Sequence, residues 1–285
     1  MDFSSISAHA SAFTGILKNY PGYPKSLYIA GKLPKERGVS VAIVGSRRPT
    51  SYGKEVTYKL AYDLAKQGVI IISGLAYGID ACAHRGALDA GGITIAVMAG
   101  GLDSIYPKQH TSLAKQIIDK GGALISEYGP DTTVYKSNFL ARNRIVSGLS
   151  DAVIITEAAQ RSGTLATVSH ALSQGKDVFA VPGAITSPLS IGPNRLLQQG
   201  AHLATSASDV LHIVAPQLVT QSRQQATSDD PAENAILQLL HKGIRDGEVL
   251  QQQSGLTISD YLQAMTMLEI NDIIRPLGGD RWTLI

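Results

Sequence analysis

Several features that would place this 285-residue chain in a special class of protein are absent or rare. Cys82 is the single cysteine, so no disulfide can form within the chain and a reducing compartment suits it. No apolar run approaches the length of a membrane span, and residues 1–20 have neither the basic start nor the apolar core of a signal peptide. Charged residues make up 17% and hydrophobic residues 44%, which is ordinary for a globular protein and excludes a disordered one. We therefore expect a cytoplasmic protein with no membrane partner.

Motifs for cofactors and metals are missing as well. The sequence has no Gly-x-Gly-x-x-Gly after an apolar run and no Gly-x4-Gly-Lys-Ser/Thr, so neither a dinucleotide fingerprint nor an ATP-binding loop is predicted. His84 and His170 fall on helix faces with no second ligand at metal spacing, which favours structural roles for both. The sequence thus predicts no cofactor, no metal and no ATP hydrolysis.

What the sequence does contain is one structural unit, repeated. The run Val41–Val44 is closed by Gly45 and followed by a helical pattern over residues 51–66, which is typical of a buried parallel strand and its crossover helix. Similar apolar runs, each ended by a polar, glycine or proline loop, predict further strands at 69–72, 93–98, 123–126, 151–156, 178–181 and 202–204. This alternation predicts an α/β fold with a doubly wound, mainly parallel sheet.

Composition divides the chain into four expected parts. These are a weakly patterned lead-in at 1–38, the α/β domain at 39–215, a linker rich in Gln, Ser and Thr at 216–231, and a small domain at 232–285. The small domain reads as helices at 232–240, 248–253 and 258–268 and a hairpin of 272–276 with 281–284, which is the order of a winged helix. Residues 1–215 carry a net charge of +6 and residues 216–285 of −4, so nucleic-acid binding is expected in the first part.

Two loops have the composition of an anion-binding site. Gly45-Ser46-Arg47 follows the first predicted strand, and Ser162-Gly163-Thr164 opens a predicted helix after the fifth. Loops at the carboxyl ends of parallel strands form the ligand crevice of such sheets, and helix starts there attract phosphate. For the first loop, the alternative is a turn that ends the strand and leaves its arginines solvated, and Arg48 is expected to be such a solvated neighbour. For the second loop, the alternative is an ordinary helix N-cap. For Glu157, beside the second loop, an ion pair with an arginine is favoured over a general base.

A third group of candidates lies on one predicted helix, residues 138–147. Phe139, Arg142 and Asn143 stand at i, i+3 and i+4 and so form one patch, with Lys136 just before it. An aromatic ring beside cations suits unstacked bases and their backbone. On spacing alone, the alternative is a core phenylalanine with arginines that brace the sheet.

Three acidic or aromatic residues are assigned structural roles. Asp80 is expected to be the N-cap of the helix at 80–90. Asp103 and Tyr106 are expected to build the turn at 102–107.

Several longer motifs occur in one order, at residues 44–47, 73–84, 100–107 and 139–150, followed by 161–164 and 181–183. Through them the chain resembles the DNA-processing protein A family, DprA or Smf, over roughly residues 20–215 and more loosely over the tail. The resemblance implies an extended Rossmann-like domain that binds single-stranded DNA, forms homodimers and delivers the recombinase RecA onto DNA in natural transformation. It implies DNA contacts from Ser46, Arg47, Lys136, Phe139, Arg142 and Asn143, with Ser162, Gly163 and Thr164 alongside.

The sequence departs from the family pattern at two places. The helical domain that many relatives carry before the Rossmann-like part has no room here, and Pro193 stands where relatives usually have a hydroxyl residue. Pro193 removes a donor from its loop, so a ligand role for that loop is less secure.

Two other functions remain open on the sequence. Related Rossmann-like enzymes with a Gly-Thr loop cleave nucleoside monophosphates, but that chemistry needs a Glu shortly after the loop, whereas residues 165–168 are Leu-Ala-Thr-Val. A winged helix can also read duplex DNA, although a net charge of −4 disfavours it. We therefore expect a single-strand binder that is not an enzyme.

Overall fold

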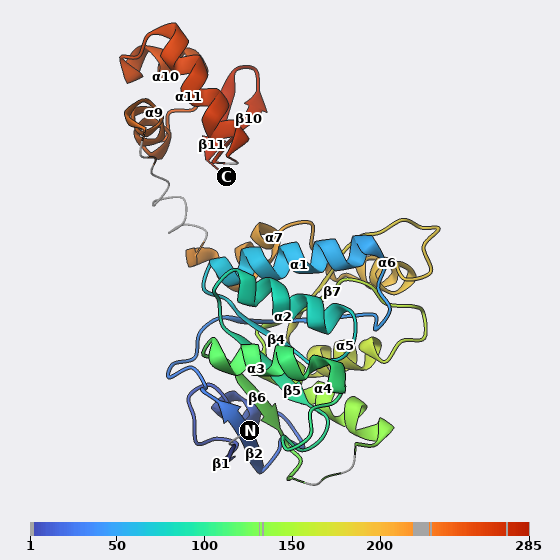
Figure 1. Ribbon diagram of the computed structural model, residues 1–285. Coiled ribbons are helices and arrows are strands. Elements are labelled where there is room, and N and C mark those ends of the chain that lie inside the picture. Colours follow the sequence, from blue (N-terminus) through green and yellow to red (C-terminus); the bar gives the residue numbers. More distant parts are fainter. Residues whose placement is uncertain are drawn as a thin grey trace. The chain divides into compact units, whose positions relative to one another are not determined.

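The structure, a computed structural model, describes residues 3–130, 132, 134–218, 228, 230–271 and 273–284. Within these residues the chain forms two compact units that divide between Ala215 and Pro216 (Figure 1). No helix in the described part of the chain has both the length and the apolar character needed to cross a membrane. Each unit is described by itself.

The first unit is built on a nine-stranded sheet in the order β1-β2-β6-β5-β4-β3-β7-β8-β9. Every neighbouring pair from β6 to β9 is parallel, whereas β1 and β2 join the edge in antiparallel orientation. The strands from β3 to β9 lie where they were predicted, and those from β3 to β8 each carry a short buried apolar run. Their bounds are β1 Ser4–Ser7, β2 Ser26–Gly31, β3 Ser40–Val44, β4 Ile70–Ser73, β5 Thr94–Met98, β6 Ala123–Ser126, β7 Ala152–Ile155, β8 Asp177–Ala180 and β9 His202–Leu203.

Helices cover both faces of this sheet, as a doubly wound fold requires. On one face α1, α2 and α3 pack side by side, with α7 against α1, and on the other α4 packs against α5 and η1 (Figure 1). Apolar strand residues alternate between the two resulting cores. The helices are η1 Gly15–Asn19, α1 Ser51–Lys66, α2 Ile79–Asp89, η2 Lys108–His110, α3 Thr111–Asp119, α4 Lys136–Leu149, α5 Thr164–Ser173, α6 Ile191–Gln198 and α7 Ala207–Val214. The predicted α/β class is confirmed.

The direction of winding reverses at β3. The chain runs outward from β3 through β4, β5 and β6, and then returns to place β7 on the other side of β3. At such a switch point the loops after the two central strands turn to opposite faces and leave a crevice between them. The loops after β3 and β7 are those that contain Ser46 and Ser162.

The described part of the expected lead-in at 1–38 contains two strands of the sheet. Strands β1 and β2 form a hairpin-like pair, and β2 extends the sheet at β6. Phe13 and Leu27 are fully buried. The strand β1 has the sequence Ser-Ser-Ile-Ser and is mostly exposed, so it carries no apolar periodicity that a sequence could reveal.

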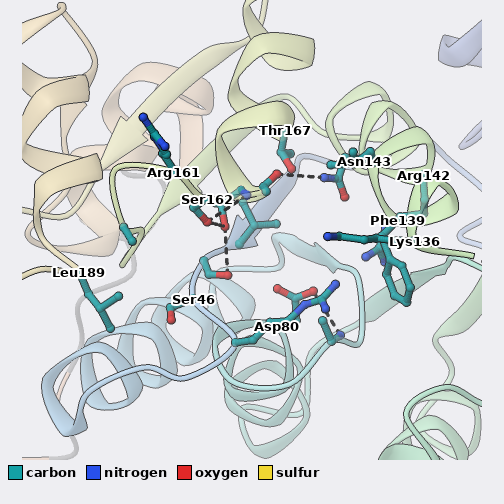
Figure 2. Close-up of a pocket in the computed structure, with 18 residues that line it drawn as sticks. Ser46, Asp80, Lys136, Phe139, Arg142, Asn143, Arg161, Ser162, Thr167 and Leu189 are labelled. Carbon is teal, nitrogen blue, oxygen red and sulfur yellow. Dashed lines mark hydrogen bonds between the residues drawn. The ribbon is translucent and has the colours of Figure 1, made fainter.

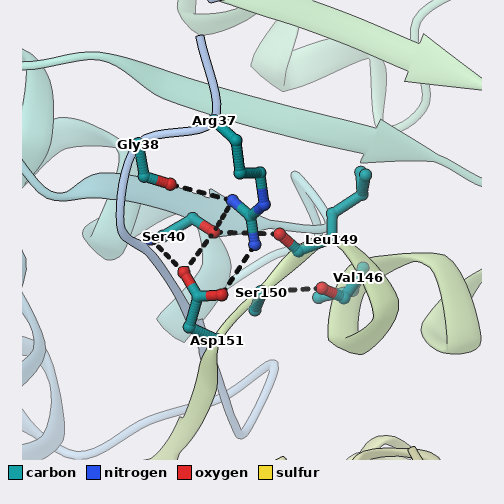
Figure 3. A network of polar contacts seen from close by, with 7 residues as sticks. All are labelled: Arg37, Gly38, Ser40, Val146, Leu149, Ser150 and Asp151. Atoms are coloured by element: carbon teal, nitrogen blue, oxygen red, sulfur yellow. Dashed lines mark hydrogen bonds and ion pairs between the residues drawn. The ribbon is translucent and has the colours of Figure 1, made fainter. Parts of the chain in front are cut away.

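A polar network fixes the amino ends of the two central strands (Figure 3). Arg37 donates to the Asp151 carboxylate at 2.8 Å and to the Ser40 hydroxyl at 2.6 Å. The other Asp151 oxygen accepts from the Ser40 amide at 2.8 Å, and the Asp151 amide donates to the Ser40 carbonyl at 2.7 Å. Because β3 and β7 are locked in register here, their far ends hold the two site loops at a fixed spacing.

The second unit is the predicted winged helix. It consists of α9 Pro231–His241, α10 Gly247–Ser254 and α11 Ile258–Ile270, followed by β10 Ile274–Gly278 and β11 Arg281–Leu284. The three helices and the hairpin enclose a core of their own. The hairpin was predicted to begin at Asp272, which lies outside the described residues, as does most of the predicted linker.

Candidate nucleic-acid interface

A pocket of about 410 Å³ lies at the carboxyl ends of β3 and β7. Figure 2 shows it between α4, which brings Lys136, Phe139 and Asn143 from one side, and the loop after β7, which brings Arg161 and Ser162 from the other. All nine residues that the sequence put forward as a DNA site line this pocket: Ser46, Arg47, Lys136, Phe139, Arg142, Asn143, Ser162, Gly163 and Thr164. Their convergence is a geometric result; their contact with DNA stays a prediction.

The aromatic ring and one cation of the site lie against each other. The guanidinium carbon of Arg47 lies 4.9 Å from the centroid of the Phe139 ring. Arg47 is exposed and Phe139 is half-buried. A cation over a ring face is attracted by the ring's quadrupole, so the contact orients Arg47 without using its hydrogen-bond donors. Those donors remain available to a ligand.

Two further cations face the same space. Lys136, the first residue of α4, and Arg161, in the loop after β7, are both exposed and both line the pocket. Asp80 is the one carboxylate among the described lining residues, and it is buried. The accessible charge in the pocket is therefore positive, which favours an anionic ligand.

The loops around the pocket are fixed by mutual hydrogen bonds. Thr164 donates from its hydroxyl to the Gly45 carbonyl at 3.1 Å, which ties the start of α5 to the loop after β3. The Ser46 amide donates to the Glu157 carbonyl at 2.7 Å, and the Ser46 carbonyl accepts from the Ile79 amide at 3.1 Å. Gly78, with a φ of 78°, permits this approach, because a β-carbon there would lie 2.4 Å from the Ser46 carbonyl oxygen.

Arg142 occupies a different place from the one expected of a DNA contact. Arg142 is only 4% exposed. Its guanidinium donates to the carbonyl of Gly74, just after β4, at 2.7 Å and to that of Val97 in β5. Burial lowers the pKa of Arg142, and the nearby Asp80 acts in the opposite direction. Arg142 thus stabilises the sheet, which was the alternative to a DNA contact that the sequence left open.

Asp80 is not the N-cap of α2, which is Gly78. Its carboxylate instead turns back and accepts from the amides of Gly74 at 3.1 Å and Ala76 at 3.2 Å. Burial raises the pKa of Asp80, while Arg142 and the two amides oppose that rise. Asp80, at the start of α2, therefore holds the loop after β4 through two backbone amides. The sequence pattern does not distinguish this role from that of an N-cap.

The prediction that Glu157 pairs with an arginine is wrong, because its carboxylate accepts from Thr50 instead. Its carboxylate is buried and bonds Thr50 at the start of α1, from the amide at 2.9 Å and from the hydroxyl. Thr50 in turn caps α1 by accepting from the Gly53 amide at 3.1 Å. Glu157 therefore neutralises the positive end of α1 from within the protein.

The histidine predictions agree with the structure. His84 is fully buried with its Nδ1 2.7 Å from the Thr94 hydroxyl, and His170 lies on α5 away from the pocket lining. Among the described residues, no group of three His, Cys, Asp or Glu side chains could hold a metal ion. The expected absence of a metal stays a prediction.

The residues of the pocket wall that the sequence did not put forward include Arg161 and Leu189. Arg161 stands one residue before the chosen loop, and its charge could have marked it. Leu189 gave no signal, because only the fold brings the loop after β8 to this place, where the Leu189 carbonyl accepts from the Ala158 amide at 2.8 Å. Two hydrogen bonds join Asn194 to Gly183 in the same loop. The Gly183 amide donates to Asn194 Oδ1 at 3.2 Å, and Asn194 Nδ2 donates to the Gly183 carbonyl at 2.9 Å.

Comparison with known families decides the relationship. The family model described as DNA recombination-mediator protein A matches residues 4–215, and a model of the DprA winged helix domain matches residues 220–280. The chain belongs to the DprA family. The resemblance drawn from the motifs is confirmed.

Relatives in the DprA family include Protein Smf of Escherichia coli, 46% identical over 66% of this chain and 50% of that protein. DNA processing protein DprA of Bacillus subtilis is 42% identical over 68% of this chain and 67% of its own length. The chain thus spans between half and about two thirds of these relatives.

Two solved DprA structures share the fold. DprA of Streptococcus pneumoniae is 41% identical, covers 75% of each chain and has a TM-score of 0.70. DprA of Helicobacter pylori, whose structure is described in terms of a single-stranded DNA binding mode, is 34% identical with a TM-score of 0.67 over 76% of this chain and 97% of that one.

Proposed function

We propose that the pocket between the loops after β3 and β7 binds the sugar-phosphate backbone and bases of single-stranded DNA. The single observation that carries this proposal is the contact of Arg47 with Phe139, 4.9 Å from guanidinium to ring centroid, at an exposed position. It offers a free fork of donors to phosphate beside an aromatic surface for an unstacked base. The description of the Helicobacter pylori relative supports the same ligand.

The helix starts around the site support an anion at one place in particular. The start of α1 already has an internal carboxylate, because Glu157 accepts from the Thr50 amide. In contrast, α4 begins without a side-chain cap among the described residues. Phosphate is therefore expected at the start of α4, beside Lys136, rather than against α1.

The pocket is proposed to bind rather than to catalyse. Cleavage of a nucleoside monophosphate would need an accessible carboxylate, and Asp80, the one carboxylate among the described residues that line the pocket, is engaged by two backbone amides. The residues after Thr164 supply no acid in its place. Incubation with nucleoside monophosphates tests this directly, and release of free base would contradict it.

The wider role we propose is recombination mediation, with RecA as protein partner and a homodimer as the working form. The family description of a DNA recombination mediator supports the first of these. The winged helix, with its net charge of −4, is proposed to contact protein rather than DNA. A strand-exchange assay with and without this protein, on DNA coated by single-strand binding protein, tests RecA loading.

Binding of labelled single-stranded and double-stranded oligonucleotides across a salt series tests the proposed ligand. We expect preference for the single strand and a slope of about −0.7 in log affinity against log salt for each phosphate neutralised. Arg47→Ala and Lys136→Ala should weaken binding and make the slope shallower. Arg48→Ala is the matched control, since Arg48 is an exposed neighbour that does not line the pocket. Unchanged affinity and slope in the first two variants would contradict the proposal.

A further inference from the structure

A second pocket lies at the loop after β5. It has a volume of about 230 Å³ and is lined mainly by that loop, through Gly101, Asp103, Ser104, Ile105, Tyr106 and Lys108. None of these six residues lines the first pocket. Because β5 is parallel to β4 and β4 to β3, the loops after β3 and β5 emerge at the same edge of the sheet.

One aromatic pair connects the two pockets. The rings of Tyr106 and Phe139 meet edge to face, with centroids 5.7 Å apart and an angle of 63°. Phe139 lines the first pocket, Tyr106 lines the second, and both line a narrow cleft between them. Arg47 also contacts Phe139, with its guanidinium carbon 4.9 Å from the ring centroid, so Phe139 contacts both other planar groups.

The sequence predicted that Tyr106 builds the turn at 102–107, and that role stays a prediction. Hydrogen bonds from other residues lie on either side of the turn, since the Ser126 hydroxyl donates to the Gly100 carbonyl at 2.6 Å and the His110 amide donates to the Pro107 carbonyl at 2.9 Å. No hydrogen bond of the Tyr106 hydroxyl occurs within the described part of the chain, and the side chain is 50% exposed. A large aromatic group held half in solvent by one ring contact leaves a face open for a ligand.

The charges of the second pocket indicate which part of a nucleotide enters it. Asp103 lines the pocket, and a carboxylate disfavours phosphate. Lys108, which is exposed, lines it as well and can meet a phosphate that stays outside. The pocket is little more than half as large as the first and suits a single planar ring.

We propose that Tyr106 and the pocket from Gly101 to Lys108 form a second subsite, which takes an unstacked base of the same DNA strand that fills the first pocket. The inference rests on the proposed function and deepens it. The strand would run across the sheet edge from the loop after β3 to the loop after β5, with successive bases on the two sides of the Phe139–Tyr106 pair. This path makes Tyr106 a binding residue and lengthens the strand that the protein protects.

The test compares Tyr106→Leu with Tyr106→Trp in the full chain. Leucine keeps the apolar volume but has no π-face, so affinity for long oligothymidylates should fall by about 5- to 150-fold, the equivalent of one lost stacking contact. Because no charge is changed, the salt slope should stay that of the unmodified protein. The shortest oligonucleotides that bind should be unaffected, since they fill the first pocket alone.

Tyr106→Trp should retain affinity, and its emission should be quenched when DNA binds, measured against the unmodified protein, whose one tryptophan is Trp282. Tyr23→Leu is the control for loss of an exposed tyrosine, because Tyr23 is 40% exposed and lines none of these pockets. It should bind like the unmodified protein.

The outcomes separate this inference from the proposed function. If the unmodified protein binds no single-stranded DNA, the proposed function fails and the subsite fails with it. If Arg47→Ala weakens binding while Tyr106→Leu matches the unmodified protein at every length, or Tyr106→Trp emission does not respond to DNA, only the second subsite is overturned. Thermal unfolding of each variant checks that the fold is retained, and the Trp variant provides the answer where Leu unfolds.

Discussion

The Arg142 guanidinium donates to the Gly74 carbonyl oxygen at 2.7 Å and so joins α4 to the loop after β4. The amide of the same glycine donates to the Asp80 carboxylate at 3.1 Å. Gly74 is therefore held at both its backbone polar groups by buried side chains of opposite charge. This arrangement forms the base of the pocket and leaves the accessible cations above it to meet a ligand.

Gly74→Ala should destabilise the protein, because a β-carbon there would lie 2.1 Å from an Arg142 nitrogen. The guanidinium is fixed by two carbonyls and cannot move aside freely, so a loss of about 1–3 kcal/mol in the free energy of unfolding is expected. Urea unfolding measures it. Gly163→Ala is the control, since its nearest neighbour would be 3.9 Å from the new carbon. Equal stabilities of the two variants would show that Arg142 is not held as described.

Arg142→Ala should cost stability before it costs binding. Its removal leaves the Gly74 and Val97 carbonyls unpaired and Asp80 without its nearby positive charge, for which roughly 3–5 kcal/mol is expected. Arg144→Ala provides the comparison, because its ion pair with Glu127 is partly exposed and should contribute under about 1 kcal/mol. A stable Arg142→Ala protein that fails to bind oligonucleotides would instead make Arg142 a direct DNA contact.

The stability of the protein should fall between about pH 6.5 and pH 3 partly through His84. Burial lowers the pKa of His84 to about 3, below its usual 6.5, so in this window the unfolded state takes up a proton that the folded state does not. The contribution is complete above pH 6.5 and declines as pH falls, by at most about 1.4 kcal/mol per pH unit. Urea midpoints over this range should show a shallower slope for His84→Gln. His9→Gln, at an exposed position, should keep the original slope.

Removal of residues 216–285 should leave single-strand binding intact. Residues 1–215 form a compact unit that contains every residue of both pockets and the net positive charge. Affinity within about threefold of the full chain is expected, since no phosphate contact is lost. Loss of most of the affinity would instead assign the winged helix a direct role on DNA.

Some of the site could be predicted because its residues follow strand ends. Ser46 and Ser162 lie in the loops that follow two apolar runs, and parallel strands must bring such loops to one edge. The sequence could not assign a role where the same residue type serves either a structural or a binding function at that position. An aspartate near a helix start is typical of a cap, but Asp80 accepts from amides of the loop before its helix. An arginine near an aromatic residue is typical of a phosphate contact, but Arg142 donates to carbonyls far away in the sequence.

The sequence by itself determined the α/β class, the strands from β3 to β8, the winged helix and the loops that bear the site, because short apolar runs and glycine turns are local signals. It also determined the family, through motifs kept in one order. Only the tertiary structure decided which cations reach solvent, since burial of Arg142 and exposure of Arg47 depend on carbonyls and rings contributed from elsewhere in the chain. The same holds for β1, whose one apolar residue, Ile6, specifies a strand only once β2 offers an edge to pair with.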